Sequence, residues 1–174
     1  MNRPRLGLII TLIAGAAVLR LLPHPPNVAP IAAMALFAGA HFVDRRWAFA
    51  VPLVALLATD LILGLHATMP FVYGAFAVTV LMGARFAARA GAAPIAATAL
   101  ASSVLFFIVT NFGTWLVEGL YPHTAAGLAA CYVAALPFFQ FTLAGDLAFT
   151  AVLFGAMALA EHHVAAVRAP AATA

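Results

Sequence analysis

Long runs of uncharged apolar residues, separated by short breaks that hold arginine or proline, constrain this chain most. The run from 94 to 117, for example, contains no charged side chain. At about 1.5 Å per residue, a helix of such a length crosses a hydrocarbon core about 30 Å thick with some tilt. Because lipid offers backbone groups no partners, a spanning segment has to satisfy them itself, as an α-helix does. The pattern predicts an all-α membrane protein.

Composition supports this prediction and excludes several classes of function. Hydrophobic residues make up 66% of the chain and charged residues 7%, against about 25% charged in a soluble domain. The net charge is +3, without any lysine, and no arginine cluster is interleaved with aromatics, so we expect no nucleic-acid partner. Cys131 is the single cysteine, which excludes a CxxC pattern. Without a Walker or hydrolase pattern we expect no enzyme activity and no cofactor.

We expect six transmembrane helices within a single domain, residues 1–163, followed by a disordered cytoplasmic tail, residues 164–174. The apolar run 127–160 is too long for one crossing, and Pro137 interrupts it, which predicts a lateral or kinked helix before Pro137. Ala35 and Gly39 have the small-xxx-small spacing that lets helices approach closely. The expected spans are 6–22, 31–43, 48–65, 71–86, 94–117 and 138–159.

The arginines predict the orientation. With six spans, the N-terminal segment, the second and fourth loops and the tail share one side of the membrane. These segments hold Arg3, Arg5, Arg45, Arg46, Arg85, Arg89 and Arg168. By the positive-inside rule both termini are cytoplasmic (N-in/C-in) in a bacterial inner membrane.

Polar residues in this orientation concentrate toward the outer half, which favours a pocket open to the outside. An ion channel would instead carry polar groups through its full thickness. On a helix, Asn111 and Trp115 share one face, and an amide beside an aromatic ring suits a flat organic ligand. The candidate substrate-binding residues are Asn27, Asp60, His66, Asn111, Trp115, Tyr121, Gln140 and Asp146.

Several of these residues also have a structural interpretation. Asp60 either pairs with Arg20 or contacts the ligand. Asp146 has no basic neighbour in sequence, so it is protonated, capped by Thr142 or another hydroxyl, or in contact with ligand. Asn111 and Gln140 are alternatively interhelical hydrogen-bond links.

The aromatic and histidine candidates also have simpler interpretations. Trp115 and Tyr121 suit an outer aromatic belt. The loop histidines His24, His66 and His123 lack metal-ligand spacing, so we expect no metal site.

Four segments carry a resemblance to a known family: RLLPHPPNVAPIAAMALFAGA (20–40), TDLILGLH (59–66), TNFGTWL (110–116) and GLAACYVAALPFFQFTLAGDL (127–147). They resemble an uncharacterised bacterial family of small integral membrane proteins described as transport proteins. In size and layout that family is similar to the S components of energy-coupling factor (ECF) vitamin transporters.

The resemblance implies a substrate-binding subunit for uptake of a vitamin-like small molecule, with a transmembrane coupling subunit and ATPases as partners. In the mechanism that we expect for such a subunit, the proline-rich first loop or the third loop closes the pocket. Small-residue faces such as Ala35/Gly39 or Ala97/Ala101 would dock the coupling subunit. The alternative is a non-transporting membrane scaffold or assembly subunit, in which the polar groups serve only helix packing.

Overall fold

The computed structural model describes residues 2–23 and 25–168, and every regular element in these ranges is a helix. A short π-helical segment, η1 (Gly83–Ala87), continues the fourth helix, and a 3-10 turn, η2 (Ala165–Val167), follows the last. The α-helices are α1 (Arg3–Leu19), α2 (Ile31–His41), α3 (Arg45–Leu63), α4 (Met69–Met82), α5 (Ala92–Val117) and α6 (Ala125–His163).

Four stretches are long and apolar enough to cross a membrane: Arg45–Leu63, Met69–Ala87, Ala92–Val117 and Ala125–His163. This confirms an all-α chain suited to a multi-pass membrane protein. The first two helices are shorter than these four. Helix α1 has 17 residues and α2 has 11, or about 25 and 16 Å of helix.

Short polar residues start three of the helices. Oδ1 of Asn2 accepts a hydrogen bond from the Arg5 amide at 3.0 Å, and so caps α1. Asp44 caps α3 in the same way, at 2.9 Å from the Arg46 amide. Thr124 caps α6 through the Gly127 amide at 3.1 Å. Each cap satisfies an amide that would otherwise lack a partner in the first turn.

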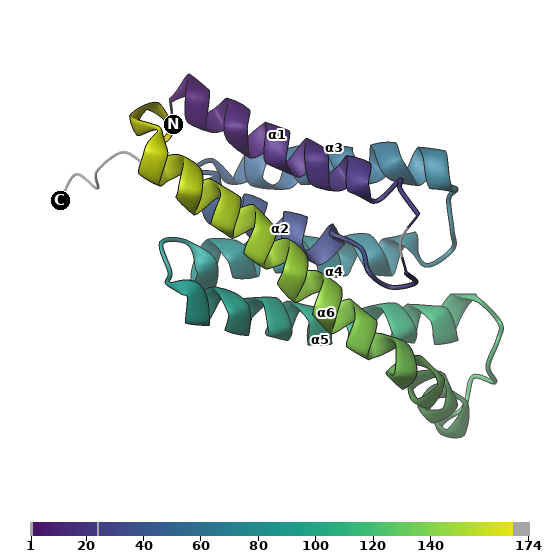
Figure 1. The fold of residues 1–174 in the computed structure, drawn as a ribbon. Coiled ribbons are helices and arrows are strands. Elements are labelled where there is room, and N and C mark those ends of the chain that lie inside the picture. The colour runs from purple at the N-terminus through teal and green to yellow at the C-terminus, as the bar shows by residue number, and fades with distance from the viewer. Residues whose placement is uncertain (1, 24, 169–174) are drawn as a thin grey trace.

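Helix α2 forms the centre of the bundle and contacts all five other α-helices (Figure 1). Its residues from Ala32 to Gly39 are all buried. A Cβ on Gly39 would lie 2.0 Å from the Val80 carbonyl oxygen, and a Cβ on Gly83 would lie 2.2 Å from that of Leu36. These glycines let the backbones of α2 and α4–η1 touch.

The small-residue spacing of α2 therefore serves packing within this chain. Close approach at Gly39 is confirmed, but Ala35 and Gly39 are buried. The suggestion that this face docks a coupling subunit was wrong, because α4 and η1 already cover it. Ala97 and Ala101 on α5 are exposed.

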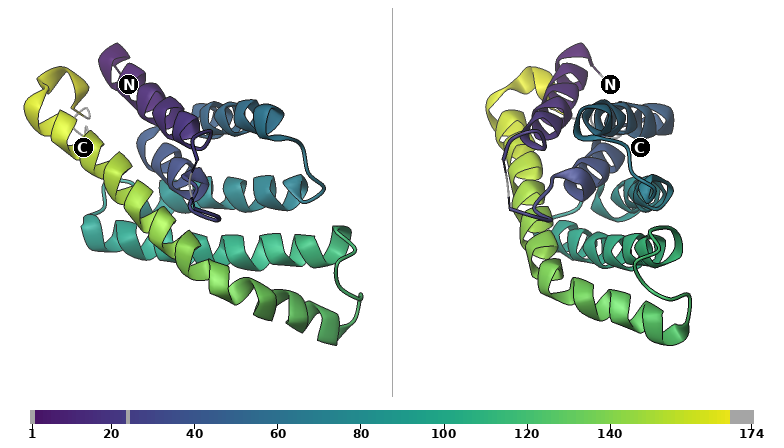
Figure 2. Two further views of the ribbon diagram at one scale, coloured as in Figure 1. Left: turned by 45° about the vertical axis from the view of Figure 1, so that its right-hand side comes forward. Right: turned by 90° about the vertical axis from the view of Figure 1, so that its right-hand side faces the viewer.

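Helix α6 has 39 residues and continues through Pro137, so the apolar run is not divided into two elements there. Its darker green N-terminal part runs in a different direction from the rest (Figure 2), which agrees with the kinked alternative. At about 1.5 Å per residue it measures roughly 58 Å along its path. It passes diagonally across the other helices (Figure 1).

The helices run alternately in opposite directions, which places the start of α1 beside the end of α6 (Figure 1). Arg5 forms an ion pair with Glu161 and donates to the Val167 carbonyl at 2.9 Å. Val167 is buried and η2 contacts α1 and α6, so this part of the expected disordered tail is held against the bundle. Residues 169–174, the remainder of the expected disordered tail, lie outside the described residues.

Candidate functional site

The larger of two adjoining cavities lies between α5, α6 and the first loop, residues 20–30. Its volume is about 240 Å³. We call it the aromatic cavity, because four phenylalanines line it beside polar side chains. It is lined by Asn27, Phe106, Phe107, Thr110, Asn111, Thr114, Ala135, Phe138, Phe139 and Thr142. Of the four phenylalanines, Phe106, Phe107 and Phe139 are half-buried and Phe138 is exposed.

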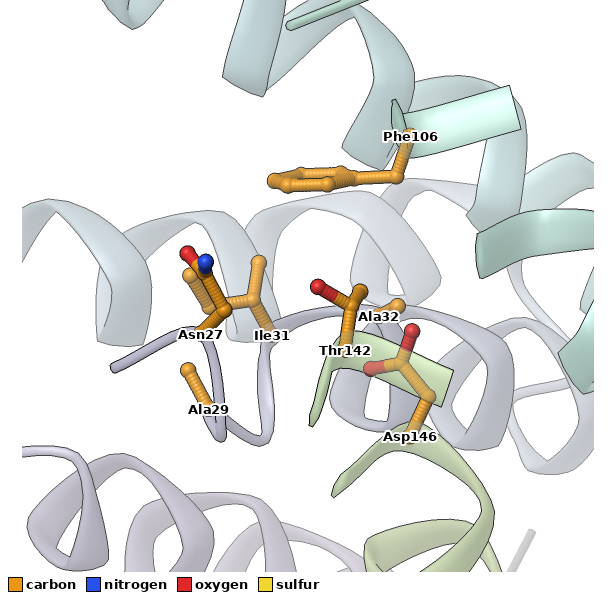
Figure 3. Close-up of a pocket in the computed structure, with 7 residues that line it drawn as sticks. All are labelled: Asn27, Ala29, Ile31, Ala32, Phe106, Thr142 and Asp146. Atoms are coloured by element: carbon orange, nitrogen blue, oxygen red, sulfur yellow. The ribbon is translucent and has the colours of Figure 1, made fainter. Parts of the chain in front are cut away.

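The smaller cavity, of about 110 Å³, adjoins the first, since Asn27, Phe106 and Thr142 line both. We call it the Asp146 cavity, and Figure 3 shows the side chains around it. The Phe106 ring lies across one side, and the oxygens of Thr142 and Asp146 lie opposite it (Figure 3). It is lined by Asn27, Ala29, Ile31, Ala32, Phe106, Thr142 and Asp146.

The first loop is held against α6 beside Asp146. A Cβ on Gly145 would lie 3.2 Å from the Cα of Val28, so the loop backbone packs directly on this part of the helix. Asn27 has a φ of 62°, a left-handed conformation that asparagine tolerates better than most residues. This turn of the backbone places the Asn27 side chain at both cavities.

Asp146 is buried, with 4% of its surface exposed. Its Oδ2 accepts a hydrogen bond from the Ser103 hydroxyl on α5 at 2.6 Å. The same hydroxyl lies 3.0 Å from the Ala99 carbonyl, so one proton serves two acceptors. Within residues 2–23 and 25–168, Oδ1 accepts no hydrogen bond and no basic side chain pairs with this carboxyl group.

Other polar groups of the two cavities also keep hydrogen-bonding capacity. The Asn111 amide nitrogen donates to the Phe107 carbonyl at 2.8 Å, which leaves its side-chain oxygen without a donor in the described chain. Across the same described ranges, Asn27, Thr114 and Thr142 make no side-chain hydrogen bond. A ligand with donors and acceptors would therefore find partners here.

Asp60 lies elsewhere, in a cluster that joins α1, α3 and α4. Arg20 contacts its Oδ1 at 2.6 Å, and the Tyr73 hydroxyl donates to its Oδ2 at 2.8 Å. Arg20 also donates to the Thr59 hydroxyl at 2.5 Å. Of the two interpretations of Asp60, the structure shows the pair with Arg20, and Asp60 lines neither cavity.

The remaining candidates do not line the cavities either. Trp115 donates to the Pro122 carbonyl at 2.9 Å, and Gln140 donates to the Pro137 carbonyl at 3.0 Å. His66 contacts the Thr68 hydroxyl at 2.8 Å, and Tyr121 is half-buried in the loop before α6.

The histidines do not form a metal centre in the part of the chain that the structure describes, where no three His, Cys, Asp or Glu side chains converge. His66 and His123 are exposed. His24 lies outside the described residues.

Of the eight sequence candidates, the structure therefore brings together Asn27, Asn111 and Asp146. Sequence reasoning missed Ser103 and the phenylalanines Phe106 and Phe107. A signal was present, because Phe107 lies four residues before Asn111 and Ser103 four before Phe107, on one helical face. Asp146 was expected to be capped by Thr142 or another hydroxyl as one alternative, and the hydroxyl that binds this carboxyl group is that of Ser103.

Comparison with known proteins identifies a family but no activity. Neither the curated proteins nor the solved structures gave a match. The sequence matches a family of unknown function, DUF6580, over residues 1–170, and the chain therefore belongs to that family.

Proposed function

We propose that this chain is a substrate-binding membrane subunit, similar to an S component, that takes up a small organic micronutrient from the outer side. The observation that carries the proposal is the pair of adjoining cavities, in which Asn27, Asn111 and Asp146 meet aromatic side chains. A mostly apolar pocket with a few convergent polar groups is typical of a small-molecule site.

In the proposed topology the chain crosses the membrane six times, with both termini in the cytoplasm. Helix α2 then acts as a half-length crossing enclosed by the others. The arginines at the start of α1, at the start of α3 and after α6 support this orientation, because positive residues favour the cytoplasmic side. The first loop lies toward the opposite end of the bundle (Figure 1). The cavities, which Asn27 of this loop lines, would therefore open outward.

Transport in this proposal needs partners that supply energy. The sequence has no phosphate-binding loop motif. A transmembrane coupling subunit and ATPases would therefore drive release of the substrate into the cytoplasm. The exposed Ala97 and Ala101 on α5 remain a candidate docking face, since small residues let another helix approach closely. The first loop, packed on α6 through Val28 and Gly145, is the candidate lid.

Ligand copurification tests the proposal. Protein purified in mild detergent is extracted and analysed by mass spectrometry, and its thermal stability is measured across a panel of vitamins. We expect a bound small molecule, or a rise in melting temperature with one vitamin class, because a ligand stabilises the state that binds it. Finding neither result would refute a substrate-binding subunit.

A second candidate function is a non-transporting scaffold subunit. One observation favours it: Asp60 and Asp146 both have hydrogen-bond partners inside the chain, as packing groups would. For a scaffold, Asn111→Ala and Asp146→Ala would weaken folding or partner association without changing uptake of any molecule. For a substrate-binding subunit, the same variants would lower ligand affinity in protein that still folds.

A further inference from the structure

The Asp146 cavity differs from an ordinary polar pocket in its charge. Its lining includes a carboxyl group, and neither cavity has an arginine or histidine among its described lining residues; the chain has no lysine. An anionic ligand would meet this carboxyl group without a counter-charge. A buried carboxylate without a partner is costly, and the cost falls when a cation comes to it.

The hydrogen bonds around Asp146 allow its carboxyl group to bind Ser103 alone or to bind Ser103 and a ligand together. Ser103 satisfies only Oδ2, and Oδ1 accepts nothing from the described chain. Without ligand, a protonated carboxyl group can donate to Ser103 while Ser103 donates to the Ala99 carbonyl, at the observed 2.6 and 3.0 Å. When a cation binds, the carboxyl group releases its proton to solvent, and the resulting carboxylate accepts hydrogen bonds from both the ligand and Ser103.

The two cavities differ in lining and size, and each suits a different part of a ligand. The smaller, of about 110 Å³, holds the carboxyl group, Thr142 and Asn27, while the larger, of about 240 Å³, has the aromatic wall. A charged head group would occupy the first, and an apolar body, such as a ring, the second. Phe106 lines both cavities, and its ring face can attract a neighbouring cation.

We infer that this site binds a small organic cation, whose protonated amine contacts Asp146 and whose apolar body lies in the aromatic cavity. This inference rests on the proposed function and specifies its substrate class. Three probes with the same ring separate charge from shape: 2-phenylethylamine is a cation at neutral pH, 2-phenylethanol is neutral, and phenylacetate is an anion.

The test is isothermal titration calorimetry on the full chain in lipid nanodiscs. We expect the amine to bind at least about tenfold more tightly than the alcohol, since a hydrogen bond to a charged group gains about this much. Phenylacetate should bind most weakly. Asp146→Asn should abolish the preference for the amine while leaving the alcohol within about twofold. Glu118→Gln, the same change at an exposed carboxylate outside both cavities, should preserve the preference.

The inference is overturned if the alcohol or the acid binds as tightly as the amine, or if the preference survives in Asp146→Asn. If that variant fails to fold, the relative affinities of the natural chain for the amine, the alcohol and the acid test the inference alone. If none of the three probes binds, the charge of the copurified molecule decides: a cation supports the inference, and a neutral or anionic molecule overturns it but leaves the proposed function standing. Absence of any bound molecule, together with no thermal shift across the vitamin panel, overturns both.

Discussion

Two buried aspartates show how similar sequence features acquire different roles. Asp60 has 1% of its surface exposed and Asp146 has 4%, so burial does not distinguish them. Asp60 forms an ion pair with Arg20 and accepts a hydrogen bond from Tyr73, whereas Asp146 has one neutral partner, Ser103, and faces a cavity. A carboxyl group with a counter-charge in its own chain stabilises the fold, and one without a counter-charge is available to a ligand.

Neutralising each aspartate should separate the two roles by the largest margin. Asp60→Asn leaves the largely buried Arg20 without its counter-charge, and removing one partner of a buried ion pair costs about 3–5 kcal/mol. Asp146→Asn loses no ion pair, so we expect a cost of about 1 kcal/mol. Reversible unfolding in mixed micelles measures both free energies.

A double variant is the control for this comparison. Arg20→Met with Asp60→Leu removes both charges together and should recover much of the stability lost in Asp60→Asn, because no buried charge remains unpaired. Equal losses for the two asparagine variants would remove the distinction between the aspartates.

Removing one hydroxyl beside each aspartate should give a smaller difference. Tyr73→Phe deletes a donor to an ionised carboxylate, for which we expect about 1.5–3 kcal/mol of lost stability. Ser103→Ala deletes a hydrogen bond to Asp146, which is neutral without ligand in the arrangement proposed above, and we expect a loss of about 1 kcal/mol. The free energies of unfolding of both variants measure this difference. A larger loss of stability in Ser103→Ala than in Tyr73→Phe would show that Asp146 also stabilises the fold.

Much of the fold could be predicted from apolar runs and their breaks. The predicted second and fifth spans begin within two residues of α2 and α5. The central position of α2 could not be predicted, because a run such as 31–41 looks the same whether lipid or protein surrounds it. Pro137 was a misleading boundary, since proline removes one helix hydrogen bond and a long helix can bend and continue.

The site was predicted in part for a related reason. Polar residues in an apolar chain are conspicuous, so Asn27, Asn111 and Asp146 were found. Phe106 and Phe107 were not, because phenylalanine in a membrane helix is as compatible with lipid as with a ligand. The choice between pairing and ligand contact for Asp60 depends on where Arg20 lies in space, which sequence spacing does not give.

Asn27 should show the smallest effect on stability. Asn27 has a φ of 62°, which glycine adopts without strain. Asn27→Gly should therefore change the unfolding free energy by no more than about 0.5 kcal/mol. The same variant should weaken ligand binding. Asn27→Val should instead lose about 1–2 kcal/mol, the strain of a left-handed β-branched residue. Thermal unfolding and ligand titration of the pair separate backbone strain from loss of the amide.

The most direct test of the ligand site is a substitution that fills the aromatic cavity with a large side chain. Ala135 lines it, while its neighbour Ala134 is exposed and does not, so Ala135→Trp and Ala134→Trp form a matched pair on α6. Mass spectrometry of extracts from both folded variants then measures the bound small molecule. We expect Ala134→Trp to retain it and Ala135→Trp to lose it, and equal retention by the two variants would contradict a ligand site between the first loop, α5 and α6.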